Sequence, residues 1–168
     1  MIILETPRLY LREMTVDDAS NAYGLNLDPD VVKYTGDVSF VSVDEAREFL
    51  ANYDHYKKYG FGRWAVIEKM NHEFLGWCGL KYTPEDDEFD IGFRFLKKYW
   101  NKGYATEAAK PCIEFGFNKW DMQVIVGRAM KENIGSIKVL EKIGLTYSRD
   151  SKCGGEPGVI YSIEKGKK

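Results

Sequence analysis

The stretch that decides the fold reads WNKGYATE and spans residues 100–107. It follows an alternating run, residues 88–96, that predicts a strand, and it opens a helix expected to end near Lys119. The first N–H groups of a helix lack intrahelical partners and carry a partial positive charge, so they favour a phosphate. Gly103 lets the backbone approach a bulky anion without a Cβ in the way. The stretch predicts a phosphate site, although one glycine before a helix is more often only a turn.

Strand and helix patterns alternate on both sides of this stretch. Thr15 and Ser42 each begin a capping-box pattern, and the helices that follow are expected to end near Leu25 and Tyr59. A further helix is predicted from about Asn133 to Gly144. The strand patterns occupy residues 8–12, 63–68, 74–82, 88–96, 123–129, 145–149 and 159–163, and a flexible loop over residues 152–158 is predicted between the last two strands. The order β-α-α-β-β-β-α-β-α-β-β predicts one mixed α/β domain over residues 1–168.

The composition argues against several classes of function. The 168-residue chain has a net charge of -2, which disfavours a nucleic-acid binder. Its apolar runs are too short to span a bilayer, and its N-terminus lacks the basic region of a secretory signal. Three cysteines without a C-x-x-C pattern indicate a reducing cytoplasm, and the two histidines are not spaced as metal ligands. We therefore expect a cytoplasmic protein with no metal, membrane or nucleic-acid partner.

Other nucleotide-binding patterns are not supported. Residues 60–65, GFGRWA, fit G-x-G-x-x-A, but they follow a predicted helix and enter a strand. A dinucleotide site requires the reverse order. The chain has no G-x-x-x-x-G-K-[ST] pattern, which argues against a P-loop NTPase.

Four segments carry a resemblance to a known family. They read ETPRLYLR (residues 5–12), DIGF (90–93), YWNKGYATEA (99–108) and NIGSIKVLEKIGL (133–145). Together they resemble the GNAT N-acetyltransferases. They look most like the RimJ/RimL-type branch, whose known members acetylate N-terminal amines of ribosomal proteins. The match covers nearly the whole chain, and the combination is more specific than any one segment.

The resemblance implies a mixed, mostly antiparallel sheet of six to seven strands with about four helices. The sheet would splay into a V between strands 88–96 and 123–129, and acetyl-CoA would be the cosubstrate. Asn133 would touch the pantetheine, and Ser136 would lie near the CoA sulfur. The pantetheine and pyrophosphate would contact Phe93, Arg94, Phe95, Leu96, Trp100, Asn101, Lys102, Gly103, Tyr104, Ala105 and Thr106.

Three residues are candidates for catalysis. Asp90 lies on the polar face of the strand that should line the cleft, so it is the first candidate for the base that deprotonates the amine. Glu88 shares that face and is the second, although either could be an ordinary solvated carboxylate. Many GNAT relatives place a tyrosine acid on the late helix, but Leu140 stands at the matching position here. Ser136 is then the candidate acid, with a capping hydroxyl as the alternative.

The acceptor is left open by the sequence. The resemblance favours a primary amine, either a protein N-terminus or a small molecule such as a polyamine, an amino acid or an aminoglycoside. A CoA-binding sensor without turnover is the alternative. Tyr34, Tyr82 and Trp64 could shape the acceptor pocket, and a cysteine nucleophile is disfavoured because no base stands beside Cys78, Cys112 or Cys153. A monomer and a homodimer are both compatible with the sequence.

Overall fold

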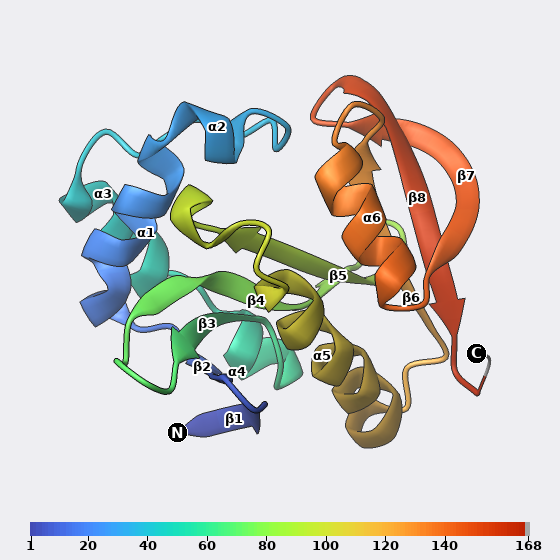
Figure 1. The fold of residues 1–168 in the computed structure, drawn as a ribbon, viewed down its shortest axis with the longest axis horizontal. Coiled ribbons are helices and arrows are strands. Elements are labelled where there is room, and N and C mark those ends of the chain that lie inside the picture. Colours follow the sequence, from blue (N-terminus) through green and yellow to red (C-terminus); the bar gives the residue numbers. More distant parts are fainter. Residues whose placement is uncertain (167–168) are drawn as a thin grey trace.

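The computed structural model describes residues 1–166, and its elements keep the predicted order with five additions (Figure 1). The additions are a first strand, two short helices and two 3-10 turns. The strands are β1 (Ile2–Glu5), β2 (Leu9–Glu13), β3 (Arg63–Glu68), β4 (Phe74–Thr83), β5 (Glu88–Phe95), β6 (Val124–Met130), β7 (Thr146–Cys153) and β8 (Glu156–Glu164). The helical segments are η1 (Val16–Asp18), α1 (Ala19–Leu27), α2 (Pro29–Val32), α3 (Val43–Ala51), α4 (His55–Tyr59), η2 (Lys97–Tyr99), α5 (Tyr104–Trp120) and α6 (Ile134–Lys142).

All the strands within these residues form one sheet, in the order β1-β2-β3-β4-β5-β6-β8-β7. Neighbouring strands are antiparallel except β5 and β6, which run parallel. That parallel pair is registered at only two positions, Phe89 with Ile125 and Asp90 with Val126. The two halves of the sheet part beyond these residues, which confirms the predicted V. The sheet has eight strands rather than six or seven, because β1 pairs with β2 and extends the edge.

Helices cover both faces of the sheet. Trp64 and Val66 of β3 belong to the core that packs against α5, whereas Ala65 and Ile67 belong to the cluster that packs against α1 and α2. This alternation is the period of two expected of a strand that is buried on both faces. In Figure 1, α5 and α6 flank the gap between β5 and β6. Both helices contribute to the core that contains Trp64 and Val66, so they cover the same face of the sheet on either side of the gap.

The predicted helix over residues 42–59 is wrong in one respect, because the structure breaks it into α3 and α4. The break brings two tyrosine hydroxyls onto the start of β3. Tyr53 Oη accepts a hydrogen bond from Arg63 N at 3.0 Å, and Tyr56 Oη donates to the Arg63 carbonyl. These contacts satisfy the backbone N–H and carbonyl of Arg63.

The predicted flexible loop over residues 152–158 is also wrong. β7 and β8 continue to Cys153 and Glu156, and only Gly154 and Gly155 connect them. Both glycines have positive φ, 59° and 82°, which is what a two-residue hairpin turn with the twist of its strands requires. The closing hairpin is therefore a tightly turned pair of strands, with one register shift between Tyr147 and Arg149.

Candidate functional site

The loop predicted to hold a phosphate leads into the N-terminus of α5. Asn101 and Gly103 adopt left-handed φ values of 61° and 80°, Gly103 is the N-cap, and no side chain caps the helix. Glu107 N donates the first helical hydrogen bond, to the Gly103 carbonyl at 3.0 Å. The N–H groups of residues 104–106 therefore have no intrahelical acceptor. An uncapped 17-residue helix with this approach fits an anion such as a pyrophosphate.

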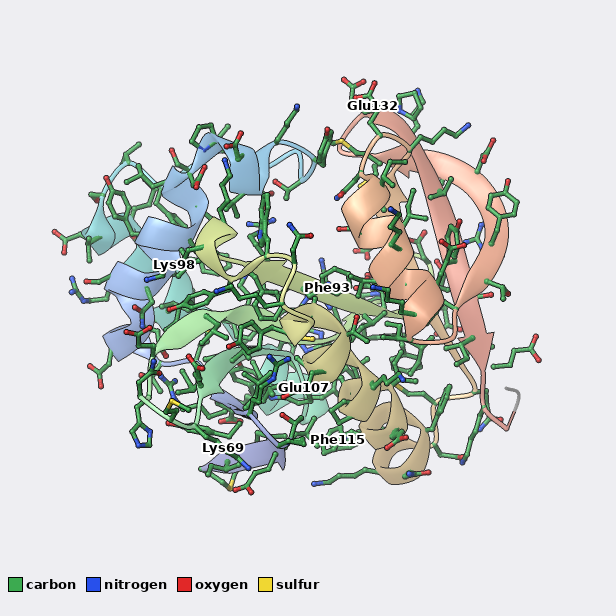
Figure 2. The ribbon with its side chains drawn as sticks, in the orientation of Figure 1. Lys69, Phe93, Lys98, Glu107, Phe115 and Glu132 are labelled. Carbon is green, nitrogen blue, oxygen red and sulfur yellow. The ribbon has the colours of Figure 1, made fainter. Side chains whose placement is uncertain are left out.

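Residues near the N-terminus of the chain hold this loop in place. Arg8 Nε lies 2.8 Å from Glu107 Oε1, and Arg8 Nη2 donates to the Lys102 carbonyl at 3.0 Å. Thr6 Oγ1 donates to Glu107 Oε2 at 2.6 Å. Glu107 stands in the first turn of α5, as Figure 2 shows. Two segments of the family resemblance, almost one hundred residues apart in sequence, are thus joined at the loop.

The ionisation of Glu107 reflects these contacts. Burial works to raise the pKa of its carboxyl, but the hydrogen bonds from Thr6 and Arg8 outweigh burial and lower the pKa overall. The Glu107 carboxylate and the Arg8 guanidinium therefore hold each other in position beside the loop. Arg8 also stacks 4.2 Å from the centre of the Tyr104 ring, the first residue of the helix.

The free edges of the V are the second part of the candidate CoA site. β5 pairs with β4 along its whole length, but its other edge has no strand partner beyond Asp90. Trp100 Nε1 donates to the Phe95 carbonyl at 2.9 Å, so the loop is tied to the end of that edge. Phe93, labelled in Figure 2, lies on the same free stretch of β5. Backbone groups there are available to an amide-containing chain such as pantetheine.

One cavity of about 800 Å³ joins the V to the opposite side of the sheet. It has the size of a small-molecule site. Its lining includes Asp90, Phe93, Arg94, Asn133 and Ser136, so it brings together five of the predicted site residues. Glu88, Phe95, Leu96 and the loop over residues 100–106 lie outside its lining. Leu96 caps η2 instead of ending β5, since the strand stops at Phe95.

Asp90 is held by two arginines that sequence reasoning missed. Its Oδ1 lies 2.6 Å from Arg63 Nη2, and its Oδ2 lies 3.0 Å from Arg128 Nη1. The Asp90 side chain is only 11% exposed. Both carboxylate oxygens therefore accept a charge-assisted hydrogen bond inside the cavity.

Arg63 reaches Asp90 by lying across two neighbouring strands. Gly79 of β4 and Gly92 of β5 are registered partners, and Arg63 Nη1 donates to the Gly79 carbonyl at 2.8 Å. A Cβ on Gly92 would stand 2.7 Å from the Arg63 guanidinium carbon. Because the paired glycines have no side chains, the Arg63 guanidinium can lie directly against the sheet. Glycines inside strands often mark such a close approach, and this was the available sequence signal.

Glu88 shares the polar face of β5 with Asp90, as predicted, but it belongs to an outer ion-pair cluster. Its Oε1 lies 2.6 Å from Arg128 Nη2, and its Oε2 lies 3.0 Å from Arg149 Nη2. Arg128 therefore bridges the two candidate carboxylates.

The start of α6 presents the predicted acid to the cavity. Asn133 caps this helix, because its Oδ1 accepts a hydrogen bond from Ser136 N at 3.2 Å. That bond uses the backbone of Ser136, so its hydroxyl is not the capping group. Leu140 is 1% exposed and fills the space over Gly127, where a Cβ would stand 2.5 Å from Leu140 Cδ2. The position that carries a tyrosine in many relatives is thus part of the core here.

Arg94 lines the far side of the cavity and was predicted only as a backbone contact. Its Nη1 donates to Asn26 Oδ1 at 2.8 Å, and its Nη2 lies 2.7 Å from Asp37 Oδ2. Among residues 1–166, its Nε is the only buried side-chain nitrogen or oxygen without a hydrogen-bond partner. Trp77 lies between two guanidinium groups, with those of Arg63 and Arg94 each 5.3 Å from its ring centre.

Two further titratable residues that line the cavity, His55 and Tyr53, already make hydrogen bonds. His55 Nδ1 donates to the Phe61 carbonyl at 2.7 Å, and its Nε2 accepts from Tyr82 N at 3.0 Å. Burial raises the pKa of the Tyr53 hydroxyl, so this cavity residue stays protonated. Neither residue is placed to act as a base toward a ligand.

The cysteines and the remaining aromatic candidates divide between core and cavity. Cys78 and Cys112 are fully buried with their sulfurs 3.9 Å apart, and burial raises the pKa of the Cys112 thiol well above its usual value. Trp64 lies in the core against Phe115. Of the predicted aromatic residues, Tyr34 lines the cavity, and Tyr82 instead donates to Asp87.

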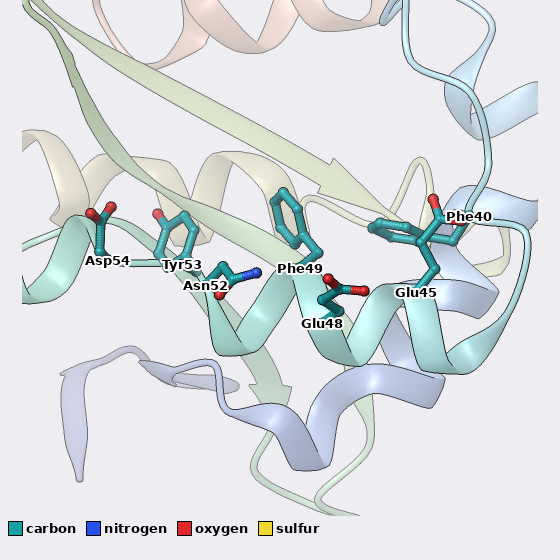
Figure 3. Close-up of a pocket in the computed structure, with 7 residues that line it drawn as sticks. All are labelled: Phe40, Glu45, Glu48, Phe49, Asn52, Tyr53 and Asp54. Carbon is teal, nitrogen blue, oxygen red and sulfur yellow. The ribbon is translucent and has the colours of Figure 1, made fainter.

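A second pocket, of about 470 Å³, lies beside the cavity along α3 (Figure 3). Phe40, Phe49 and Tyr53 line both spaces and form their common wall. The outer pocket carries the carboxylates of Glu45, Glu48 and Asp54.

Similarity to known proteins agrees with this geometry. The family model of the acetyltransferase (GNAT) domain matches residues 8–146. The uncharacterized N-acetyltransferase p20 of Bacillus licheniformis is 31% identical over 169 residues, which cover 99% of this chain and 90% of p20. The crystal structure of a GNAT-family acetyltransferase from Bacillus anthracis has a TM-score of 0.84 and 28% identity, with 99% of this chain and 100% of that chain covered.

A third protein shares the fold at lower identity. It is the ribosomal-protein-S5-alanine acetyltransferase from Vibrio fischeri, with a TM-score of 0.82, 17% identity, and coverage of 99% of this chain and 97% of that chain. Within residues 1–166, no helix is both long and apolar enough to cross a membrane. The matched domain, the V-shaped sheet and the uncapped helix lead to one conclusion: the chain belongs to the GNAT family, which uses acetyl-CoA, and is an N-acetyltransferase.

Proposed function

We propose that the protein transfers the acetyl group of acetyl-CoA to a primary amine by direct attack within a ternary complex. One observation carries this proposal. A single cavity is lined by Ser136 on the α6 side of the V and by Arg94 on the opposite side of the sheet. A thioester entering through the V and an amine entering from the other side would meet in this space.

The donor half of the site supplies mainly backbone groups. The free N–H groups at the start of α5 would bind the pyrophosphate, and Lys102 and Thr106 would add side-chain contacts. The free edge of β5 from Phe93 to Phe95 would pair with pantetheine. Asn133 would contact the pantetheine from α6, and an N–H of β5 would stabilise the oxyanion.

The acceptor must lose a proton before it can attack. An aliphatic amine with a pKa of about 9–10 is only ~0.1–1% uncharged at pH 7, a penalty of roughly 3–4 kcal/mol. Asp90 is the carboxylate nearest the apex of the V, but protonating it would weaken its ion pairs with Arg63 and Arg128. We therefore infer that Asp90 accepts a hydrogen bond from the amine and orients it, while the proton leaves through water.

The remaining steps balance as follows. The amine nitrogen forms a bond to the carbonyl carbon, and the carbon–sulfur bond of the thioester breaks. After the attack the nitrogen carries one excess proton. The Ser136 hydroxyl, which no helix-capping bond occupies, would donate its own proton to the departing thiolate and take back the proton that the nitrogen releases, directly or through water. This step demands little, because a thiol has a pKa of only about 8.5.

Membership of the RimJ/RimL-type branch is part of the proposal. It rests on the four sequence segments and on the fold shared with the Vibrio fischeri ribosomal-protein acetyltransferase. The fold alone does not define the acceptor.

An acceptor screen tests the proposed function. The purified protein is incubated with acetyl-CoA and a panel of amino acids, N-terminal peptides, polyamines and aminoglycosides, and free CoA is measured. Acetyl-CoA without acceptor gives the hydrolysis control. Acceptor-dependent CoA release, with the N-acetyl product seen by mass spectrometry, is expected. Tight acetyl-CoA binding without release from any amine would favour the sensor alternative.

A further inference from the structure

The acceptor side of the cavity is closed over by a loop, residues 33–41, which we call the roof loop. It connects α2 to α3, and in Figure 1 the chain after α2 extends toward the β7–β8 turn. Gly36 meets that turn so closely that a Cβ on Gly36 would lie 2.9 Å from Gly154 Cα. Gly36 and Cys153 both line the cavity. A space bridged in this way suits an enclosed small molecule better than the end of a protein chain.

The charges inside the cavity do not suit a polycation. Two carboxylates line it, those of Asp37 and Asp90, and both already pair with arginine. A polyamine would need unpaired carboxylates for its additional ammonium groups. Lys81 also lines the cavity and adds a further positive charge.

The Arg94 guanidinium is the group best suited to recognise an acceptor. Its side chain is 11% exposed, whereas its partner Asp37 is 56% exposed and belongs to the roof loop. A guanidinium binds carboxylates with two parallel hydrogen bonds, but Arg94 uses only Nη2 toward Asp37 and leaves Nε without an acceptor. A buried donor left unpaired is unfavourable, which favours a ligand or rearrangement that satisfies it.

We propose that the acceptor is a small amine that also carries a carboxylate, and that Arg94 binds this carboxylate in exchange for Asp37. The inference rests on the proposed acetyl transfer and narrows its acceptor class. Asn26 of α1 accepts a hydrogen bond from the other guanidinium nitrogen, so Arg94 would stay in place while Asp37 is exchanged for the acceptor. Release of Asp37 would free the roof loop for entry of the acceptor.

Matched acceptor pairs test this assignment. Each amino acid is compared with its own carboxamide, which keeps the amine and side chain but removes the negative charge, and spermidine is included as a polycation. For the native protein, kcat/KM for the best acids should exceed that for their amides at least tenfold. In Arg94→Gln the acid-to-amide ratio should fall to about one. Arg94→Lys should give an intermediate ratio, because charge is retained without the planar fork.

Controls separate this selectivity from general damage. Arg47→Gln removes the same charge from an exposed site on α3 and should retain the native ratio. Asp37→Asn removes the internal carboxylate and should lower KM for acids more than for amides. Equal kcat/KM values for acids and amides, a ratio unchanged by Arg94→Gln, or a preference for spermidine would overturn the proposal.

A binding measurement decides the question without turnover. Calorimetry on the CoA-saturated protein compares N-acetyl amino acids, the expected products, with their carboxamides. Binding of the acids alone, lost in Arg94→Gln, supports carboxylate recognition even if no amine is acetylated, in which case only the proposed transfer fails. Equal binding of acids and amides contradicts the role of Arg94.

Discussion

The proposed donor and acceptor halves of the site differ in the groups that form them. The donor half uses backbone groups of one continuous segment, from the free edge of β5 through the loop to the start of α5. The acceptor half uses side chains from β3, β5, β6 and the roof loop, among them Arg63, Arg94 and Arg128. Backbone contacts depend on the conformation of the chain and tolerate many side chains. Side-chain contacts, in contrast, can be lost or altered by a single substitution. Under the proposed assignment, a change of acceptor would therefore need changes in the acceptor half alone.

Substitution of Gly103 should have the largest effect on acetyl-CoA binding by the donor half. Gly103→Val places a β-branched residue at φ 80° and a side chain where the pyrophosphate would approach. We expect acetyl-CoA affinity, measured by calorimetry, to fall by about a hundredfold or more, since contacts with the pyrophosphate worth about 3 kcal/mol would be lost. Gly166→Val is the matched control, because Gly166 has φ 81° and open space around it. Normal acetyl-CoA affinity in Gly103→Val would refute the loop assignment.

Asp90→Asn, a change in the acceptor half, should lower kcat without changing the affinity for acetyl-CoA. We expect kcat to fall by about one to two orders of magnitude, because the amine loses its charged partner, while acetyl-CoA affinity stays within about twofold. Steady-state kinetics and calorimetry measure the two quantities, and thermal unfolding reports the lost ion pairs. The same measurements on Glu88→Gln show which of the two carboxylates contributes more to kcat. Unaltered turnover in Asp90→Asn would remove this residue from the mechanism.

Ser136→Ala tests the contact between the halves, since Ser136 lies on α6 beside the proposed pantetheine site and would act on the leaving group. A thiolate needs little help to depart, so we expect kcat to fall only about tenfold, with acetyl-CoA affinity preserved. Pre-steady-state rates of CoA release provide the measurement. A drop in affinity with unchanged kcat would instead assign Ser136 to pantetheine binding.

Acid pH should weaken the donor half slightly through Glu107. Its folded-state pKa lies below the ordinary value of about 4.3, so its contribution is present above that pH and is lost as pH falls through the folded pKa. We expect acetyl-CoA affinity to decline about threefold more in the native protein than in Glu107→Gln when pH falls from about 5 to 3. Parallel declines in both proteins would show that the Arg8–Glu107 pair does not position the loop.

The sequence could predict the strand, loop and helix of the proposed donor half because their signals are local. A strand, a glycine and a helix follow one another within residues 88–119, and the V between β5 and β6 was expected from the family resemblance. The acceptor half could not be predicted in the same way. Arg63 meets Asp90 only because the sheet registers Gly79 against Gly92, and Arg94 meets Asp37 across 57 positions of sequence. Such pairs depend on strand register, which composition and periodicity do not define.

Element boundaries failed where tertiary contacts compete with local preference. The helical pattern continues through Asn52, but the hydroxyls of Tyr53 and Tyr56 bind the start of β3 and interrupt it. Gly154 and Gly155 suggested a flexible loop, although two adjacent positive φ values also make a tight hairpin turn.

Initial-rate kinetics with both substrates varied test the central claim most directly. If the amine attacks acetyl-CoA while both occupy the cavity, double-reciprocal plots will intersect, and no acetylated protein will be found by mass spectrometry after incubation with acetyl-CoA alone. Parallel lines together with an acetylated side chain would contradict the account, because they would show that the protein carries the acetyl group between two separate reactions.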